Sequence, residues 1–458
     1  MLINEMLGGV RKGIVEGHMR VRRFVSGVVF VLGVYFFGMY LTAADGGPIL
    51  TDHLLFVLFG SNNRAQIDCS DGGGPLPCNH EILKTPNGGV EIVDLGTDPP
   101  TFRKSIDLGA SNPTSIAVAP DGKRFYFVDA LNFNVYTVDS ATGAFLNTAP
   151  IPEGPLDCVL SPDGKYLYVT TREPSIVTIE TALGATVGKT APGQPYPEQF
   201  GGIALNPGAN DNNQLAVAAT SSAPAYYLFG AKKAAVTLGP RIEVSGPCTD
   251  PFCGRADDVV FAGANQVLLA NLVCSELYGF NLPAGTQISG SGSFASEACM
   301  PLNPQNSLLY SSLTEHAYLV YRRFSFGITP GMAVVNPADF SSFMISGITG
   351  VPEAAAFAPD ARSLYIVSQQ TFTTPFILRH YDALTGALTD PGYTFATFTF
   401  DRTAIDAKVV QAPGVFALLS AGLPFVGGKG VAGSLGQVAL LLFGVALLGL
   451  DRKRRQRQ

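Results

Sequence analysis

The sequence predicts an all-β fold, and three observations lead to this prediction. Short apolar stretches recur seven times along the 458 residues, at intervals of 41 to 56 residues. Each stretch has apolar side chains at alternate positions, the pattern of a strand with one buried face. Glycine (51) and proline (32) are abundant, as folds rich in turns require. A strand-forming repeat of about 40 to 50 residues is typical of a propeller with one blade per repeat. We therefore expect a seven-bladed β-propeller.

The seven predicted innermost strands end at six prolines and one glycine. These marker residues are Pro120, Pro162, Pro207, Gly263, Pro304, Pro359 and Pro413. The positions four and two before each marker form the alternating column, for example Ile116 and Val118 before Pro120. The repeats run through residues 45–414, which we predict to form one propeller.

A second predicted strand follows most markers, such as Phe125–Val128, Leu167–Thr170 or Leu308–Ser311. The first repeat differs, because its second strand, Leu54–Phe59, has no innermost strand before it. The last innermost strand, Ala407–Pro413, has no blade after it. We expect this C-terminal strand to pair into the first blade and close the ring, which would also remove exposed sheet edges.

Three of the markers begin a common motif. Pro120–Val128 reads Pro-Asp-Gly-Lys-Arg-Phe-Tyr-Phe-Val, and Pro162–Thr170 and Pro359–Val367 are similar to it. Together with Asn134–Gly143 downstream, this motif resembles the YVTN family of β-propeller repeats. The resemblance, which extends to lactonase-like propellers, implies a secreted or periplasmic seven-bladed ring but not one particular activity. Pro, Asp and Gly each favour a tight turn, so we expect the motif to be structural.

Both ends of the sequence carry an apolar run beside basic residues. Phe24–Leu41 follows a basic stretch and precedes small residues, so residues 1–44 are expected to be a signal peptide or an uncleaved signal anchor. Residues 415–434 are expected to be an apolar, glycine-rich linker, 435–450 a C-terminal transmembrane helix and 451–458 a basic cytoplasmic tail. A sorting signal of the kind that exosortases process is the alternative for this tail, but the Pro-Glu-Pro motif is missing. The propeller is therefore expected in the bacterial cell envelope, periplasmic or surface-exposed, tethered to the inner membrane.

The middle of the chain is acidic. Residues 45–450 contain 20 Lys and Arg against 33 Asp and Glu, a net charge of −13, without a basic stripe. This balance argues against a nucleic acid partner. We expect another envelope protein or a small ligand instead.

Six of the seven cysteines are expected to form local disulfides in an oxidising compartment. The pairs are Cys69–Cys78, Cys248–Cys253 and Cys274–Cys299, whereas Cys158 falls in the buried column. The first pair lies in a long insertion of the first blade, and all three pairs are expected near one face, where they would stiffen a docking surface. The cysteines do not combine into a convincing four-ligand zinc set.

Acidic residues recur shortly before the predicted innermost strands. The candidate carboxylates at the mouth of the channel are Glu153, Asp157, Glu198, Asp257, Glu297 and Glu353, with Asp258 beside one of them. Such a rim could bind Ca²⁺ or another divalent cation, or supply a general base for lactone hydrolysis. The glutamates lie six to nine residues before their markers, so they do not describe one ligand shell. We assign no catalytic residue and predict no cofactor.

A membrane-tethered binding or scaffold module is therefore the predicted function. A lactonase-like hydrolase that uses the channel-mouth carboxylates and a divalent cation is the alternative. The sequence has no Gly-x-Ser-x-Gly elbow and no Cys-x-x-Cys-His haem motif, so serine hydrolase and haem chemistry lack support.

Overall fold

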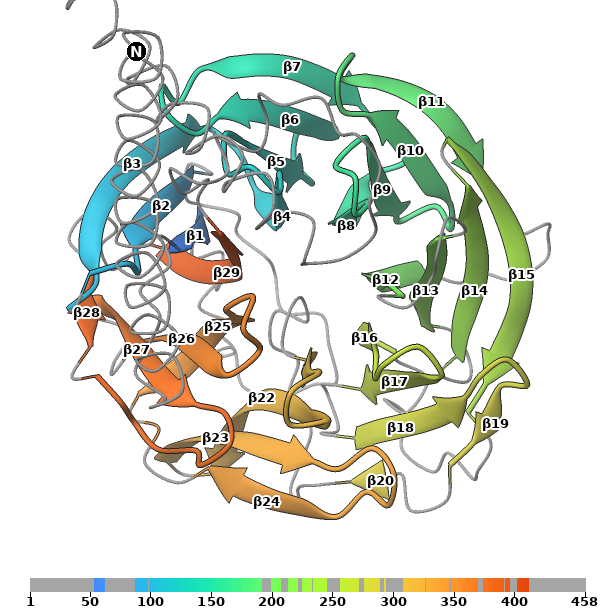
Figure 1. Ribbon diagram of the computed structural model, residues 1–458. Helices are drawn as coiled ribbons and strands as arrows, with labels where there is room; N and C mark the ends of the chain where they lie inside the picture. Colours follow the sequence, from blue (N-terminus) through green and yellow to red (C-terminus); the bar gives the residue numbers. More distant parts are fainter. Residues whose placement is uncertain are drawn as a thin grey trace, which may run out of the picture. The chain divides into compact units, whose positions relative to one another are not determined.

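The computed structural model consists of seven antiparallel sheets arranged around a ring (Figure 1). It describes residues 53–411 except for gaps at 62–86, 98, 192–198, 207–212, 221–224, 233, 245–255, 272–275, 289–291, 294–307, 326, 346–347, 349, 370–373, 391 and 396–401. The predicted all-β class and the seven blades are confirmed. No helix among the described residues has the length and apolar character that a membrane crossing requires. The segments predicted as signal, linker, C-terminal helix and tail lie outside the described residues.

The first three sheets have four strands each. They contain β29 (Arg402–Gln411), β1 (His53–Ser61), β2 (Gly88–Asp94) and β3 (Thr101–Gly109); β4 (Pro113–Val118), β5 (Arg124–Asp129), β6 (Asn134–Asp139) and β7 (Phe145–Pro150); and β8 (Pro155–Leu160), β9 (Tyr166–Thr171), β10 (Ile176–Glu180) and β11 (Ala185–Thr190).

The other four sheets follow the same antiparallel order. They contain β12 (Gln199–Leu205), β13 (Asn213–Thr220), β14 (Ala225–Lys232) and β15 (Ala235–Glu243); β16 (Asp258–Phe261), β17 (Gln266–Asn271), β18 (Glu276–Asn281) and β19 (Thr286–Gln287), with β20 (Gly292–Ser293) also on β18; β21 (Leu308–Ser311), β22 (His316–Ser325), β23 (Gly327–Val335) and β24 (Ser342–Ile345); and β25 (Val351–Phe357), β26 (Ser363–Gln369), β27 (Phe376–Asp382) and β28 (Tyr393–Thr394).

One strand of each sheet lies nearest the centre of the ring (Figure 1). These inner strands are β29, β4, β8, β12, β16, β21 and β25, and each contacts the inner strands of the two neighbouring sheets. In the first sheet, β29 pairs antiparallel with β1, so that His53 lies opposite Gln411. The first and the last strand of the described chain are therefore neighbours.

The sixth sheet corrects one predicted strand assignment. The spacing of the markers predicts Leu308–Ser311 as the second strand of its blade, but it is β21, the inner strand of that sheet. The turn after β21 has no Pro-Asp-Gly motif, and Glu315 within it has a φ of 56°. Pro304 and the inner strand predicted before it lie outside the described residues.

The Pro-Asp-Gly motif builds the turn between the first and second strands of a blade. Gly122 has a φ of 65°, a conformation that glycine adopts without strain. The Asp121 side chain accepts a hydrogen bond from Lys123 N at 3.1 Å, and Asp163 accepts one from Lys165 N at 3.1 Å. The motif is structural, as expected.

The hydrophobic core of the described residues is divided into seven clusters rather than one. Each cluster lies between the facing sides of two neighbouring sheets. One of them joins the last sheet to the first and contains Leu55 and Val57 of β1 with Val367 and Phe376. This arrangement explains why both alternating sides of a strand can be apolar, since each side packs against a different blade.

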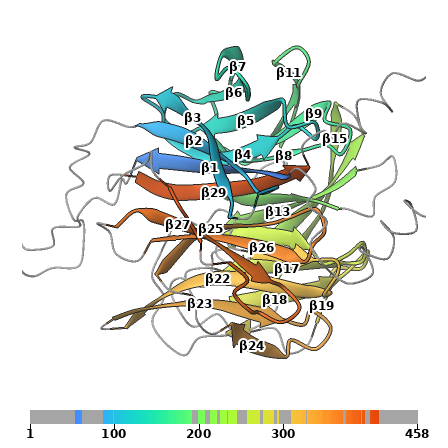
Figure 2. The same ribbon diagram turned by 60° about the vertical axis from the view of Figure 1, so that its left-hand side comes forward.

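The ring has two faces. Each face contains one end of every strand, and Figure 2 shows the strands running from one face to the other. One face carries the Asp-Gly turns together with His53 and Gln411, because the Gly122 turn packs beside Leu54 and Val410. We call it the turn face. The opposite face carries the segments that enter the inner strands and those between second and third strands, such as 129–134 and 151–154. We call it the loop face.

Candidate binding surface on the loop face

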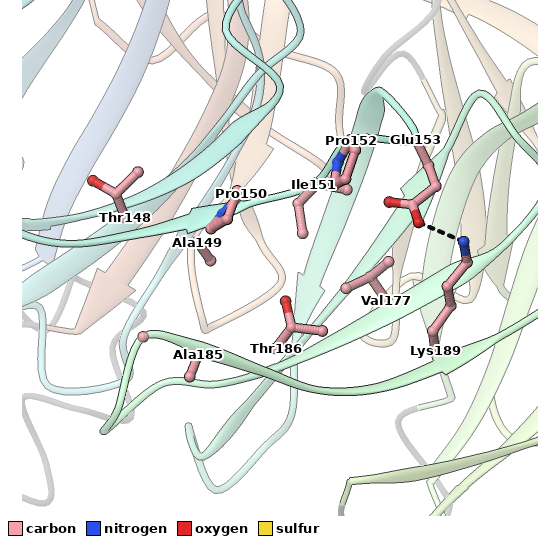
Figure 3. Close-up of a pocket in the computed structure, with 11 residues that line it drawn as sticks. Thr148, Ala149, Pro150, Ile151, Pro152, Glu153, Val177, Ala185, Thr186 and Lys189 are labelled. Atoms are coloured by element: carbon pink, nitrogen blue, oxygen red, sulfur yellow. Dashed lines mark hydrogen bonds and ion pairs between the residues drawn. The ribbon is translucent and has the colours of Figure 1, made fainter.

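A groove of about 410 Å³ lies between the second and third sheets (Figure 3). Its walls come from β7 with the segment that follows it, and from β10 and β11. The lining residues are Thr148, Ala149, Pro150, Ile151, Pro152, Glu153, Val177, Gly184, Ala185, Thr186 and Lys189. Most of these side chains are apolar, and the two charged ones form an ion pair, Glu153 with Lys189.

A buried aspartate fixes the loop beside this groove. Asp129, at the end of β5, is fully buried and accepts hydrogen bonds from Asn112 N and Leu131 N, both at 3.0 Å. It also accepts one from Asn132 Nδ2 at 2.6 Å. Because one carboxylate holds several donors of the 129–134 loop, the loop has little freedom to lose on binding.

This loop displays two large apolar side chains to solvent. Leu131 is 45% exposed and Phe133 is 43% exposed. Phe133 has a φ of 55°, in the left-handed region that disfavours residues with a side chain. Its carbonyl accepts a hydrogen bond from Ile151 N at 2.7 Å, so the loop adjoins the groove.

A second phenylalanine provides a contrast to Phe133. Phe340, in the turn after β23, has a φ of 57° but is only 6% exposed and belongs to a hydrophobic cluster. The burial of Phe340 offsets the cost of its backbone conformation. The larger exposure of Phe133 leaves less packing within the chain to offset the same cost.

Charged groups border the groove on the loop face. The hydrogen bond from Lys189 lowers the pKa of the Glu153 carboxyl, so this carboxylate is ionised at neutral pH. Arg172 is exposed, and its side chain lies against Gly154 together with Phe133. A backbone hydrogen bond from Arg172 N to Gly154 O, at 2.8 Å, holds the two loops together. The groove runs along the outer strands from Gly184 and Ala185, at the turn face, to Pro150–Glu153 and Lys189, at the loop face. We call Leu131, Phe133, Arg172 and the loop-face end of the groove the loop-face patch.

The composition of the patch is typical of a binding surface. It combines an apolar groove, exposed aromatic and aliphatic side chains and a guanidinium, the residue types that are enriched at protein interfaces. Its one carboxylate, Glu153, is held by Lys189. Among the described members of the predicted channel-mouth carboxylates, Glu153 is the one that lines this groove.

The other predicted aspartates lie in the inner strands. Asp157 of β8 is 6% exposed; its Oδ1 accepts a hydrogen bond from Cys158 N at 2.7 Å and its Oδ2 accepts one from Ile203 N, in the next inner strand, at 3.0 Å. Asp258 of β16 repeats this arrangement with Val259 N at 2.8 Å and Leu308 N at 3.1 Å. Each carboxylate therefore links two consecutive blades.

A third aspartate completes this set and was missed by the sequence analysis. Asp406 of β29 is fully buried and accepts a hydrogen bond from Ile116 N of β4 at 3.0 Å. Its other oxygen lies 3.2 Å from Lys408 Nζ. We call Asp157, Asp258 and Asp406 the inner aspartates. A pattern in the sequence could have identified Asp406. Asp157 and Asp258 directly precede the first residue of the alternating column in their blades, and Asp406 does so if the last column begins at Ala407 and not at Val409.

Burial and the charge of a neighbouring aspartate change the pKa of Asp157 and Asp258. Burial, followed by the charge of Asp157, raises the pKa of Asp258 to about 7. Burial likewise raises the pKa of Asp157. Burial lowers the pKa of Lys408, but the charges of Asp406 and Asp157 outweigh this effect and raise it overall. The structure thus brings two predicted residues and two unpredicted ones into one electrostatic group.

Asp257 and Glu353, the two remaining predicted carboxylates among the described residues, do not join a common site. Asp257 is 4% exposed. Its backbone N–H donates to Ala270 O in the same sheet, and its carbonyl accepts a hydrogen bond from Gly202 N in the neighbouring sheet. Glu353 lies half-buried in β25, at a bulge of that strand. Glu198, Glu297 and the six cysteines predicted to form disulfides lie outside the described residues. Cys158 is unpaired and buried, as expected for the column, and burial raises the pKa of its thiol.

The predicted carboxylate rim does not form a metal site in the described part of the chain. No three His, Cys, Asp or Glu side chains among the described residues are grouped so that they could bind a metal ion.

Comparisons with known proteins agree with the architecture. No protein-family model matches the chain. A seven-bladed beta-propeller protein of Mycobacterium tuberculosis (strain ATCC 25618 / H37Rv) is 29% identical over 123 residues, which is 25% of this chain. The match spans 31% of that relative's length.

Solved structures of low sequence identity share the fold. A candidate 6-phosphogluconolactonase from Bacteroides uniformis has a TM-score of 0.55 at 15% identity, covering 78% of this chain and 100% of that chain. A protein from Lactobacillus plantarum has a TM-score of 0.53 at 15% identity, covering 79% and 99%. At such identities the likeness concerns the fold alone. By its repeats, its seven sheets and these relatives, the chain is a seven-bladed β-propeller.

Proposed function

We propose that this propeller is held at a membrane of the bacterial cell envelope and binds a partner protein through its loop face. The observation that carries the proposal is the pairing of His53 with Gln411 on the turn face. Chain segments that leave the ring before β1 and after β29 start from neighbouring points on the turn face, and the loop face is the opposite face of the ring.

The apolar runs near the two ends support the tether. Phe24–Leu41 is separated from His53 by 11 residues, Thr42 to Asp52. An extended chain of this length spans at most about 40 Å. An uncleaved anchor at Phe24–Leu41 would thus keep the turn face near the membrane. We propose, in addition, that the pairing of β29 with β1 is what closes the ring in solution.

The loop-face patch supports the binding role. Its loop is preorganised by Asp129 and its groove is present before any partner arrives. Preformed surfaces lose less conformational entropy on association.

A lactonase-like hydrolase is the alternative function, and the pKa of Asp258 near 7 is the observation that favours it. Both oxygens of Asp258 accept backbone hydrogen bonds, however, and its side chain is 6% exposed. These contacts favour a structural role over that of a general base. Measurable lactone turnover that Glu153→Gln or Glu353→Gln abolishes, together with a bound divalent cation, would establish the hydrolase instead.

Membrane fractionation of the full chain tests the tether. The protein should stay in the membrane pellet after alkaline carbonate extraction, and protease added outside the inner membrane should reach the propeller. A variant with Leu441→Arg and Val445→Arg in the C-terminal run, combined with Val28→Arg and Val31→Arg in the N-terminal run, should move to the soluble fraction. Extraction of the unchanged chain by carbonate would refute the tether.

Photo-crosslinking from single positions tests the binding face. A photoreactive phenylalanine analogue in place of Asp107 or Gln199, both exposed on the loop face, should yield adducts with protein in living cells. The same analogue in place of Leu384, which is 53% exposed on the turn face, should yield fewer. Adducts from Leu384 alone would contradict the proposed binding face.

A further inference from the structure

We infer that the loop-face patch binds an extended segment of a partner protein in which apolar side chains flank a single carboxylate. The inference rests on the proposed function and names the chemistry of the partner at that face.

The apolar part of the recognition follows from the groove and the loop beside it. Ile151, Val177 and the neighbouring prolines line a groove of about 410 Å³, within the range of sites that hold small apolar groups. Phe133 adjoins the groove through the hydrogen bond from Ile151 N to its carbonyl, and Leu131 is exposed in the same loop. A segment that fills the groove would therefore extend over both side chains, which a compact small molecule would not reach.

The charged part of the recognition follows from Arg172. Its side chain is exposed, and among the described residues no ion pair involves it. Lys189, by contrast, is already paired with Glu153. A guanidinium presents a planar fork of donors that matches a carboxylate. Residues 45–450 carry a net charge of −13, so a strongly acidic partner would be repelled, and one carboxylate is the charge that this site fits.

The position of the patch argues for protein over lipid. Leu131 lies on the loop face, opposite the points where the chain enters and leaves the ring. Arginine is among the residues that dominate binding energy at protein interfaces, and phenylalanine is enriched there.

Photo-crosslinking of the full chain in its native cells tests the inference. The photoreactive phenylalanine analogue replaces Leu131, and the adduct is digested and sequenced by mass spectrometry. We expect one main partner peptide with an Asp or Glu within a few residues of the linked position. In the same background, Arg172→Glu should reduce the adduct about tenfold or more, and Arg172→Lys should retain part of it.

Two controls separate this inference from the proposed function. Glu173→Gln changes a neighbouring exposed charge and should leave the adduct unchanged, and thermal unfolding should show that every variant is folded. If Asp107 and Gln199 yield adducts but Leu131 does not, the inference is wrong and the proposed function stands. Adducts from Leu131 that consist of lipid, or that are insensitive to Arg172→Glu, also overturn it. The absence of adducts from all three positions refutes both.

Discussion

The inner aspartates and the loop-face patch are both unusual, in opposite ways. The first are charged side chains that are buried, and the second contains large apolar side chains that are exposed. The aspartates bury carboxylates at the centre of the ring, and each of these accepts the backbone N–H of the next inner strand. The patch exposes Leu131 and Phe133, with Phe133 in an unfavourable backbone conformation.

The two regions differ in what offsets the free-energy cost of burying a carboxylate or exposing an apolar side chain. Hydrogen bonds within the chain compensate the burial of the aspartates, so their role is complete in the isolated propeller. The exposure of the patch has no comparable compensation within the described chain. The first region is therefore structural, and the second is the surface at which we propose that a partner binds.

Removal of an inner aspartate should give the largest effect. Asp406→Ala leaves the Ile116 N–H and the Lys408 charge without the oxygens that they contact. We expect the free energy of unfolding to fall by about 3 kcal/mol, measured by chemical denaturation. Asp406→Asn, which keeps an acceptor oxygen for Ile116 N, should lose clearly less. Equal losses for the two variants would mean that the hydrogen bond between blades is not the cause.

The pH dependence of stability should show the next largest effect. The pKa of Asp258 is about 7 in the folded ring, against an ordinary value of 3.8, so the folded state binds this proton more tightly than the unfolded chain. The free energy of unfolding should therefore decrease as pH rises from about 4 to about 7, with a contribution of at most about 1.4 kcal/mol per pH unit. Asp139 and Asp163 have a lowered pKa, so their contribution to the free energy of unfolding is lost only as the pH falls below about 4.

The control for this pH dependence is Asp258→Asn, which cannot titrate. Denaturation midpoints measured between pH 5 and pH 8 should vary less in this variant than in the unchanged protein. If both give the same slope, another group is responsible for the pH dependence.

The two phenylalanines with positive φ provide a smaller but sharper comparison. Asparagine tolerates the left-handed conformation, so Phe133→Asn should leave the free energy of unfolding unchanged or raise it by up to about 1 kcal/mol. The matched change Phe340→Asn removes a buried side chain and should lower it by about 3 kcal/mol. Thermal or urea unfolding of both variants measures the difference. A large loss for Phe133→Asn would show that this side chain serves the propeller itself.

The ion pair of the groove should give the smallest effect. In Glu153→Gln the interaction with Lys189 is lost, but the Lys189 side chain is 45% exposed. We expect a change below about 1 kcal/mol in the free energy of unfolding, because solvent screens such pairs. A loss of several kcal/mol in a denaturation experiment would place Glu153 among the structural carboxylates instead.

Parts of the fold were predictable because their signals are local. The alternation of apolar residues over Phe125–Val128 and the Pro-Asp-Gly turn before it identify a strand and its turn within about ten residues. The sixth blade shows the limit of this approach. The turn after Ser311 carries no Pro-Asp-Gly motif, so no local signal in the sequence identifies Leu308–Ser311 as an inner strand.

The candidate site was predictable only in its components. Asp157 and Glu153 were both predicted as carboxylates near the inner strands, yet one holds two blades together and the other borders an outer groove. Leu131, Phe133 and Arg172 carry no motif that distinguishes them from ordinary loop residues. Their common location depends on contacts between two blades.

The sequence by itself determined the strands, the turns and the number of repeats, because strand alternation and turn preferences act between residues close along the chain. Only the tertiary structure decided which side chains meet across blades. Asp406 and Ile116 are 290 positions apart and become partners only when the ring brings β29 beside β4.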